Sequence, residues 1–199
     1  MAGTETARKA VLQGLDRALR DEIVAMTADL VNIPSPTGEE AAISDYVHGR
    51  FSGLGLKTVR QEVESRRCNV VATLAGQAQG RSLFFNAHFD TSTTGKEEGL
   101  PEGHKPHARI IDDWIYGLGV SNMKNAFAGY YGAIKMIQKA GVALRGDIIM
   151  GGVVGEIEKA PVDQYQGELY RGGGLGSQHM MKHGVSADFC ICGEPTGLR

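Results

Sequence analysis

Apolar side chains in the first thirty residues recur at the spacing of one helix face, at Val11, Leu15, Leu19, Ile23, Met26 and Leu30. This spacing predicts one amphipathic helix, which the proline-containing segment NIPSPTG ends. A second helix is expected to begin directly afterwards. Thr37 and Glu40 stand three residues apart, as in a capping box, so Glu39 and Glu40 are interpreted as helix-start residues rather than a catalytic carboxylate pair.

Beyond residue 56 the pattern changes to short alternating or apolar runs. These runs, bounded by glycine and charged turns, predict three strands within KTVRQEVE, CNVVATLAG and RSLFFNAHFD. Residues 91–107 are rich in polar residues and glycine and predict a loop. Residues 108–117 (ARIIDDWIYG) predict a hairpin around Asp112 and Asp113.

The second half of the chain alternates helices and strands. Residues 123–140 predict a well-buried helix of small and apolar side chains, and DIIMGGVVGEIE predicts the strand that follows. A short helix is expected around GLGSQHMMKHG and a further strand in ADFCICGEPTG. Alternating strands and helices indicate an α/β layered domain with functional loops at the carboxyl ends of the strands.

Polar side chains gather where the predicted strands end, at His88, Asp90, Asn122, Glu156, Glu158 and Glu194. Residues i and i+2 of a strand share a face, so His88 and Asp90 are expected to stand together. Histidine nitrogen and carboxylate oxygen suit zinc or a similar divalent cation. Each group alone has a plainer explanation, as a surface hydrogen-bonded pair, a solvated strand end or, for Asn122, a helix N-cap. Their convergence favours a site.

Three other motifs compete weakly with a metal site. GLGVSN is similar to a dinucleotide-binding GxGxxG, but Asn122 replaces the third glycine, and GGGLGS lacks the lysine of a phosphate-binding loop. GVSNM differs from a nucleophile elbow, and no His and Asp pair stands at a spacing that singles out Ser121. A nucleotide-binding module would need cofactor binding that depends on Gly117 and Gly119.

Composition limits the classes of binding partner and the cellular compartment that are expected. At 199 residues, 42% of them hydrophobic, the chain suits one globular domain. A formal charge of −2 with scattered basic residues provides no footprint for nucleic acid or an anionic membrane, so a small-molecule substrate is expected. No stretch is apolar for long enough to span a bilayer. Cys68, Cys190 and Cys192 form no disulfide framework, and the Cys-x-Cys pair is interpreted as two small buried hydrophobes in a reducing cytoplasm.

Six segments occur in the order and approximate spacing of a known family: NIPSPTGEE, CNVVATLAG, NAHFDT, YGLGVSNMKNAFAG, VVGEIE and CGEPTG. Through these segments the chain resembles the co-catalytic zinc hydrolases that include acetylornithine deacetylase, succinyl-diaminopimelate desuccinylase, aminoacylase and the glutamate carboxypeptidases. The resemblance implies a three-layer α/β/α sandwich with a mixed, mostly parallel sheet, as in zinc-dependent exopeptidases. Residues 1–199 would form the amino-terminal part of such a catalytic domain.

The resemblance also implies roles for individual residues. A His matching His88 binds a metal, and an Asp matching Asp90 orients that His. A Glu matching Glu156 acts as general base on a metal-bound water, and a carboxylate matching Glu194 binds a metal. These roles explain why a strand would end on a histidine and an aspartate two residues apart.

The sequence departs from the family pattern in three places. Asn122 stands where the family has a metal-bridging Asp. Ile157 stands where a second Glu follows the base, and Glu158 lies one residue further on. The lid or dimerisation domain that the family inserts after GEPTG, and the last His ligand beyond it, are absent from these residues.

Asn122 bears on the number of metal ions. Two dications about 3.5 Å apart repel by roughly 19 kcal/mol at an effective dielectric of about 20, and a bridging carboxylate offsets much of this, whereas a neutral amide cannot. A standard two-metal centre is therefore not expected. One ion of zinc, cobalt or manganese is expected on His88, Glu194 and Glu158, with Asn122 as a weak oxygen donor or a plain N-cap.

Two function hypotheses follow from these residues. The leading one is a metal-dependent hydrolase of amide or related C–N bonds, in which metal-bound water, deprotonated by Glu156, attacks a polarised carbonyl. The rival is a non-catalytic or degenerate subunit of a split hydrolase. A complementary carboxyl-terminal half or a homo-oligomer is expected to cover an open sheet edge and apolar helix faces, so the chain alone is not expected to be a clean monomer.

Overall fold

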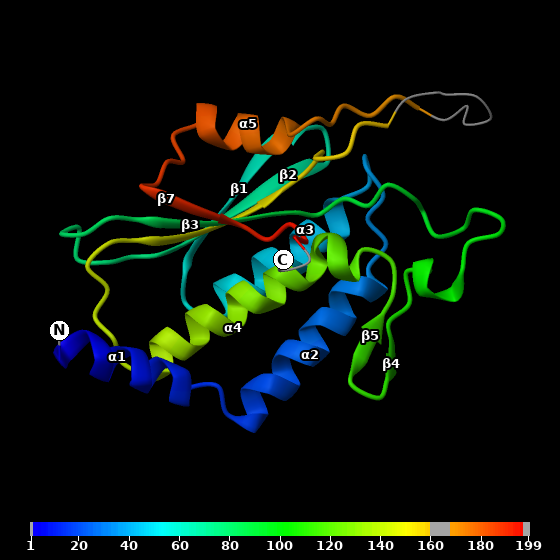
Figure 1. The fold of residues 1–199 in the computed structure, drawn as a ribbon. Coiled ribbons are helices and arrows are strands. Elements are labelled where there is room, and N and C mark those ends of the chain that lie inside the picture. Colours follow the sequence, from blue (N-terminus) through cyan, green and yellow to red (C-terminus); the bar gives the residue numbers. More distant parts are fainter. Residues whose placement is uncertain (1, 160–167, 197–199) are drawn as a thin grey trace.

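The N-terminal segment forms two helices rather than one. The computed structural model describes residues 2–159 and 168–196, and in it α1 spans Ala2–Gln13 and α2 spans Arg17–Asn32 (Figure 1). Asp16 caps α2, because its carboxylate accepts a hydrogen bond from the Leu19 amide at 2.9 Å. The prediction of one helix is therefore wrong. The apolar spacing runs on through Leu15 and so conceals the break.

The third helix, α3, spans Ala41–Ser52 and begins without the predicted capping box. Glu40 occupies the N-cap position, but its side chain makes no cap hydrogen bond. Instead Glu40 pairs with Arg67, and the Thr37 hydroxyl donates a hydrogen bond to Asp90. The capping-box interpretation is therefore wrong, because tertiary partners far along the chain take both side chains.

Five strands form one mixed sheet in the order β1-β2-β6-β3-β7. Strands β6, β3 and β7 are mutually parallel, β2 pairs antiparallel with β6, and β1 pairs antiparallel with β2. The bounds are Lys57–Glu64 (β1), Arg67–Leu74 (β2), Leu83–His88 (β3), Ile148–Val153 (β6) and Phe189–Cys192 (β7). All five predicted strands of this sheet are confirmed. Because β3, β6 and β7 are parallel, their carboxyl ends meet at one edge.

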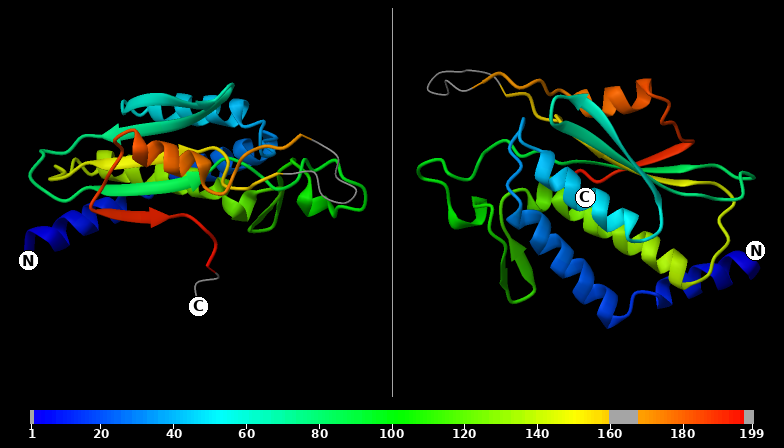
Figure 2. Two further views of the ribbon diagram at one scale, coloured as in Figure 1. Left: turned by 90° about the horizontal axis from the view of Figure 1, so that it is seen from above. Right: turned by 180° about the vertical axis from the view of Figure 1, so that it is seen from behind.

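Helices cover both faces of the sheet (Figures 1 and 2). Helices α2, α3 and α4 (Asn125–Lys139) pack on one face, and α5 (Leu175–Lys182) packs on the other. Alternate residues of β3 serve the two faces, because Phe85 lies in the core with α4 while Phe84 packs with Met180 of α5. The predicted three-layer α/β/α arrangement is confirmed.

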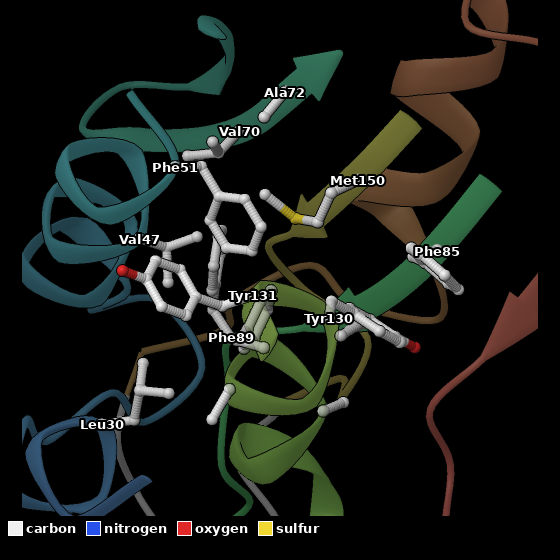
Figure 3. Close-up of a cluster of buried hydrophobic side chains, with 14 of the residues drawn as sticks. Leu30, Val47, Phe51, Val70, Ala72, Phe85, Phe89, Tyr130, Tyr131 and Met150 are labelled. Atoms are coloured by element: carbon white, nitrogen blue, oxygen red, sulfur yellow. The ribbon is translucent and has the colours of Figure 1, made fainter. Parts of the chain in front are cut away.

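The larger core lies between the sheet and helices α2 to α4 (Figure 3). Phe85 stacks on Tyr130 with ring centroids 4.7 Å apart, and Phe89 stacks on Phe127 at 5.0 Å. Such pairs contribute about 0.5–1.5 kcal/mol beyond the area that they bury. Phe89 is the residue between His88 and Asp90. Its stacking on α4 therefore anchors the backbone that bears both polar side chains.

The segment between β3 and α4 contains the predicted hairpin. Strands β4 (Arg109–Ile111) and β5 (Trp114–Tyr116) pair antiparallel, so the hairpin is confirmed. A 3-10 turn, η1 (Glu102–His104), precedes the hairpin, and a kinked turn, η2 (Val120–Lys124), follows it, with non-helical backbone angles at Asn122 and Met123. Turn η2 leads directly into α4 and carries Asn122 to the carboxyl edge of the sheet.

Strand β7 lies at one end of the strand order, and all four of its residues are exposed. Cys190 and Cys192 are therefore exposed, and their interpretation as small buried hydrophobes is wrong. The sequence shows that this segment is a strand, but not that it is an edge strand. Among the residues that the structure describes, no helix is both long and apolar enough to cross a membrane.

Candidate active site

His88, the last residue of β3, lies at the centre of a polar cluster and is 2% exposed. Its Nε2 atom lies 2.7 Å from Oδ1 of Asn122 and 3.4 Å from Oε1 of Glu194. Asn122 comes from η2, and Glu194 follows β7. Three of the predicted metal ligands, each from a different segment, therefore converge on one point.

Asp90 faces the other ring nitrogen of His88, with its Oδ1 atom 3.4 Å from Nδ1. This distance is long for a hydrogen bond, and Nδ1 has no hydrogen-bond partner among the described residues. The Asp90 carboxylate accepts hydrogen bonds from the Thr37 hydroxyl at 3.0 Å and from the amides of Glu156 at 3.1 Å and Ile157 at 2.9 Å. Asp90 thus contacts both the imidazole and the turn after β6.

The pKa values of His88 and Asp90 are shifted in opposite directions, and each shift favours the charged form. Burial alone would lower the pKa of His88, but Asp90, Asn122 and Glu194 favour the charged ring, and the net pKa is raised. Burial would raise the pKa of Asp90, but His88 and the two backbone amides stabilise the carboxylate, and the net pKa is lowered. Binding of a cation at Nε2 would compete with protonation of this ring.

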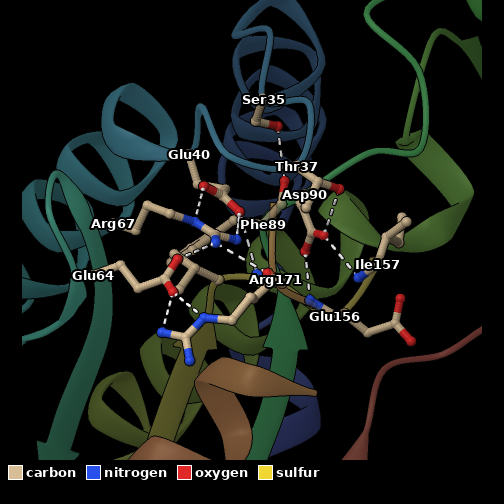
Figure 4. A network of polar contacts seen from close by, with 12 residues as sticks. Ser35, Thr37, Glu40, Glu64, Arg67, Phe89, Asp90, Glu156, Ile157 and Arg171 are labelled. Carbon is tan, nitrogen blue, oxygen red and sulfur yellow. Dashed lines mark hydrogen bonds and ion pairs between the residues drawn. The ribbon is translucent and has the colours of Figure 1, made fainter. Parts of the chain in front are cut away.

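The turn after β6 bears the two remaining predicted residues, Glu156 and Glu158, and both are exposed. The side chain of Glu156 extends away from Asp90, although its backbone amide is bonded to that residue (Figure 4). In the described part of the chain, no group of three or more His, Cys, Asp and Glu side chains is arranged to hold a metal ion. The structure therefore does not bring Glu158 together with His88 and Glu194.

A cavity of about 320 Å³ opens beside Asn122. Its lining includes Ser92, His104 and Ser121, together with Ile157 from the turn after β6. Ile157 stands where the resembled family has a second Glu, so the departure at this position makes one wall of the cavity apolar. The cavity is large enough for a small chemical group next to the His88 cluster.

Sequence reasoning missed four buried polar residues around the site: Thr37, Glu40, Arg67 and Lys124. The Lys124 ammonium donates a hydrogen bond to the Ile33 carbonyl at 2.7 Å, and burial lowers the pKa of this lysine to about 8. Three of these residues lie in family-like segments, which is the signal that could have marked them. Nothing in the local sequence marks Arg67.

The structure is an α/β domain with a polar cluster at the carboxyl ends of its parallel strands, where open α/β sheets commonly bind ligands. The profile of peptidase family M20/M25/M40 matches residues 84–199, and the chain belongs to this family. The resemblance inferred from its motifs is thereby confirmed.

Two curated relatives match almost the whole chain. Succinyl-diaminopimelate desuccinylase of Dinoroseobacter shibae is 30% identical over 176 residues, which cover 87% of this chain and 42% of that protein. N-formyl-4-amino-5-aminomethyl-2-methylpyrimidine deformylase of Bacillus subtilis is 27% identical over 185 residues, which cover 90% of this chain and 40% of that protein. The chain therefore spans about two fifths of the length of these relatives.

Solved structures confirm the fold. A tripeptidase from Staphylococcus aureus matches with a TM-score of 0.64 and 22% identity, over 85% of this chain and 42% of that one. Aminopeptidase PepT from Bacillus cereus matches with a TM-score of 0.65 and 20% identity, over 86% of this chain and 42% of that one. The polar cluster of this chain therefore lies on the fold shared with these two proteins.

Proposed function

We propose that residues 1–199 supply the amino-terminal part of the catalytic domain of a metal-dependent hydrolase of amide or related C–N bonds in a small molecule. The observation that most supports this is the convergence of His88, Asn122 and Glu194 beside the turn that bears Glu156. Membership of a peptidase family, with a desuccinylase and a deformylase among the relatives, supports amide chemistry.

The donor atoms fit one divalent cation better than two. Two tetrahedral ligands about 2.1 Å from one ion lie roughly 3.4 Å apart, and the Nε2 atom of His88 and Oε1 atom of Glu194 are 3.4 Å apart. The Oδ1 atom of Asn122 lies 2.7 Å from Nε2, which is a hydrogen-bond distance, so this neutral oxygen would have to move apart from Nε2 to join the same ion. The Glu194 side chain is 40% exposed, which leaves one side open. Zinc suits this nitrogen and oxygen set, and cobalt and manganese are further candidates.

Each polar residue then has a task in hydrolysis. When bound, the cation supplies Lewis acidity, which polarises the scissile carbonyl and lowers the pKa of water. Glu156 accepts a proton from the attacking water and returns it to the leaving nitrogen. Asp90 orients the His88 ring through Nδ1 and holds the Glu156 backbone. The cavity beside Asn122 receives part of the substrate.

A non-catalytic subunit of a split hydrolase is the second candidate function. Asn122 and Ile157 favour it, because both replace acidic residues of the resembled family with uncharged ones. A single carboxylate, Glu194, then contacts the Nε2 atom of His88, on the side of the ring away from Asp90. Such a site would bind a cation weakly and could serve only to stabilise an assembly.

We further propose a complementary carboxyl-terminal polypeptide, or a second copy of this chain, as the partner. In the described residues β7 pairs on one side only, with β3. Phe189 and Ile191 are 50% and 49% exposed on this strand, and a bare apolar edge favours association. A monodisperse monomer in light scattering, with no dye-accessible apolar surface, would contradict the proposed association.

The free thiols of Cys190 and Cys192 suit a reducing compartment such as the cytoplasm.

Turnover tests the proposed function. The chain is assayed alone and with the carboxyl-terminal part of a family relative, in the presence of zinc, cobalt or manganese. N-succinyl, N-formyl and dipeptide substrates represent the chemistry of the relatives and structural neighbours. Metal-dependent amine release supports the hydrolase. No release with any of the three metals in the reassembled protein would favour the non-catalytic subunit.

A further inference from the structure

The turn that bears Glu156 is held between two buried carboxylates from different parts of the chain (Figure 4). Asp90 accepts hydrogen bonds from the amides of Glu156 and Ile157 at 3.1 and 2.9 Å. Glu40 accepts one from the amide of Gly155 at 3.2 Å. Three consecutive N–H groups therefore point at two anions, of which Asp90 is 1% and Glu40 0% exposed.

Arg67 fixes the Glu40 carboxylate in place. Its Nη2 and Nε atoms donate to the two oxygens of Glu40 at 2.7 and 3.0 Å, in the bidentate geometry that only a guanidinium provides. Its Nη1 atom donates to the Arg171 carbonyl at 3.0 Å and to Glu64 at 2.6 Å. One buried cation thus connects α3, β1 and the segment that leads into α5.

The same arginine lies directly against the turn. Gly155 has φ 64°, and a Cβ atom at this position would lie 2.8 Å from Nη2 of Arg67. Only glycine fits here, both because φ is positive and because the guanidinium occupies the space. The Gly155 carbonyl accepts the amide of Leu175, the first residue of α5, at 3.0 Å. The turn is therefore hydrogen-bonded through three consecutive amides and also through the Gly155 carbonyl.

Stability alone does not account for the Glu40–Arg67 pair. The desolvation of two buried charges opposes their attraction, and apolar residues of similar volume commonly serve as well or better. An apolar pair could not accept the Gly155 amide. What the ion pair adds is an oriented anionic acceptor for the amide of Gly155, which precedes the two amides bonded to Asp90.

We propose that Glu40 and Arg67 are positioning residues for Glu156. They clamp the turn at Gly155 while Asp90 clamps it at the next two amides, so that the Glu156 side chain leaves a backbone fixed by two carboxylates. The role assigned to Glu156 rests on the proposed function. Whether Glu40 and Arg67 hold the turn in place can be tested without an activity assay.

Amide hydrogen exchange in the 199-residue chain, resolved by NMR, tests the clamp with two matched double variants. Glu40→Leu/Arg67→Met removes the acceptor, whereas Glu40→Gln/Arg67→Met keeps an acceptor oxygen without the charges. In the first variant, exchange at Glu156 and Ile157 should rise about tenfold or more, although their own acceptor, Asp90, is unchanged. In the second the rise should be smaller, between about threefold and tenfold, because an acceptor remains but the guanidinium that oriented it is gone.

Equal exchange at Glu156 and Ile157 in wild type and the Leu/Met variant would overturn the clamp, as would an equal rise throughout β6. If the double variants do not fold, Arg67→Lys decides, because it keeps the charge but not the fork. A rise of about threefold or more at the same two amides is then expected, and no rise overturns the proposal. Glu22→Gln, in an ion-pair network with Arg50 and Lys135, is the control and should leave the turn unchanged.

Turnover separates this inference from the function on which it rests. Where the reassembled protein is active, the Leu/Met variant should lower kcat about tenfold or more and leave KM within about twofold, because Glu156 is misplaced while the binding cavity is intact. An equal change in KM would contradict positioning. If wild type shows no turnover but exchange responds as expected, the proposed function fails and the clamp stands.

Discussion

The inner and outer halves of the candidate site differ in burial and in the completeness of their contacts. The inner half consists of Thr37, Glu40, Arg67, His88 and Asp90, and none of these is more than 3% exposed. The outer half consists of Glu156, Glu158 and Glu194, whose carboxylates are exposed or partly exposed. The residues that position the site thus lie in the interior of the chain. It presents the carboxylates proposed for chemistry and metal binding on the surface, where a substrate or partner can reach them.

The largest expected effect separates the two halves by stability. Asp90→Ala removes the acceptor of three hydrogen bonds and leaves His88 buried without its counter-charge. Breaking a buried pair from one side costs about 3–5 kcal/mol of unfolding free energy. Glu158→Ala, on the exposed side, should change it by no more than about 0.5 kcal/mol. Urea denaturation measures both, and similar values would show that the division is false.

Within the outer half, turnover should distinguish Glu156 from Glu158, although both are exposed. Glu156→Gln should lower turnover of the reassembled protein by about 100-fold or more, because the amide is isosteric but cannot accept a proton. Fold and metal content should remain nearly unchanged. The matched variant Glu158→Gln should have a much smaller effect, since Glu158 forms no metal-binding group with His88 and Glu194 in the described residues. A Glu156→Gln protein with more than about a tenth of wild-type activity would contradict the assigned base.

Metal content tests whether the outer half is incomplete. A protein zinc site usually has three or four ligands, and here the cluster offers His88, Glu194 and the neutral Asn122. We expect less than one zinc per chain after exhaustive dialysis, and more when the complementary half is added. Asn122→Asp should raise the occupancy, and Asn122→Asp/Ile157→Glu should raise it further. Elemental analysis that finds two tightly held zinc ions in the unmodified chain would overturn the ligand assignment.

The smallest expected effect lies at the rim, where Glu64 joins Arg67 to Arg171. Burial would raise the pKa of Glu64, but hydrogen bonds from both arginines outweigh it, and the net pKa lies below the ordinary 4.5. Ionised Glu64 therefore stabilises the folded state fully at pH values above its ordinary pKa. This contribution is lost as the pH falls through the lowered pKa of the folded state.

Glu64→Gln should destabilise the chain by up to about 1 kcal/mol at neutral pH, and the difference from wild type should shrink as the pH falls toward 3. Urea midpoints between pH 7 and pH 3 measure this trend. Glu62→Gln, at an exposed position of the same strand, is the control. A difference that grows on acidification would show that the sign of the pKa shift is wrong.

The periodic parts of the fold could be predicted from the sequence. The strands of the sheet, the hairpin, and helices α4 and α5 follow from apolar spacing and turn residues, because side-chain burial in these elements repeats with a fixed period. The break at Asp16 and the exposure of Cys190 and Cys192 could not be predicted this way. A cap interrupts a helix without changing its period, and the position of a strand within a sheet depends on pairings along the whole chain.

The sequence by itself determined the family, the layered fold and the residue types of the site, since His88, Asp90 and Asn122 stand at the ends of recognisable elements. Only the tertiary structure decided which of these residues meet. It brought Asn122 and Glu194 to His88, left Glu158 apart, and turned Thr37 and Glu40 from an expected cap into contacts of Asp90 and Arg67. Local preferences such as capping contribute about 1 kcal/mol, and buried partners distant in sequence outweigh them because a buried polar group without a hydrogen bond costs more.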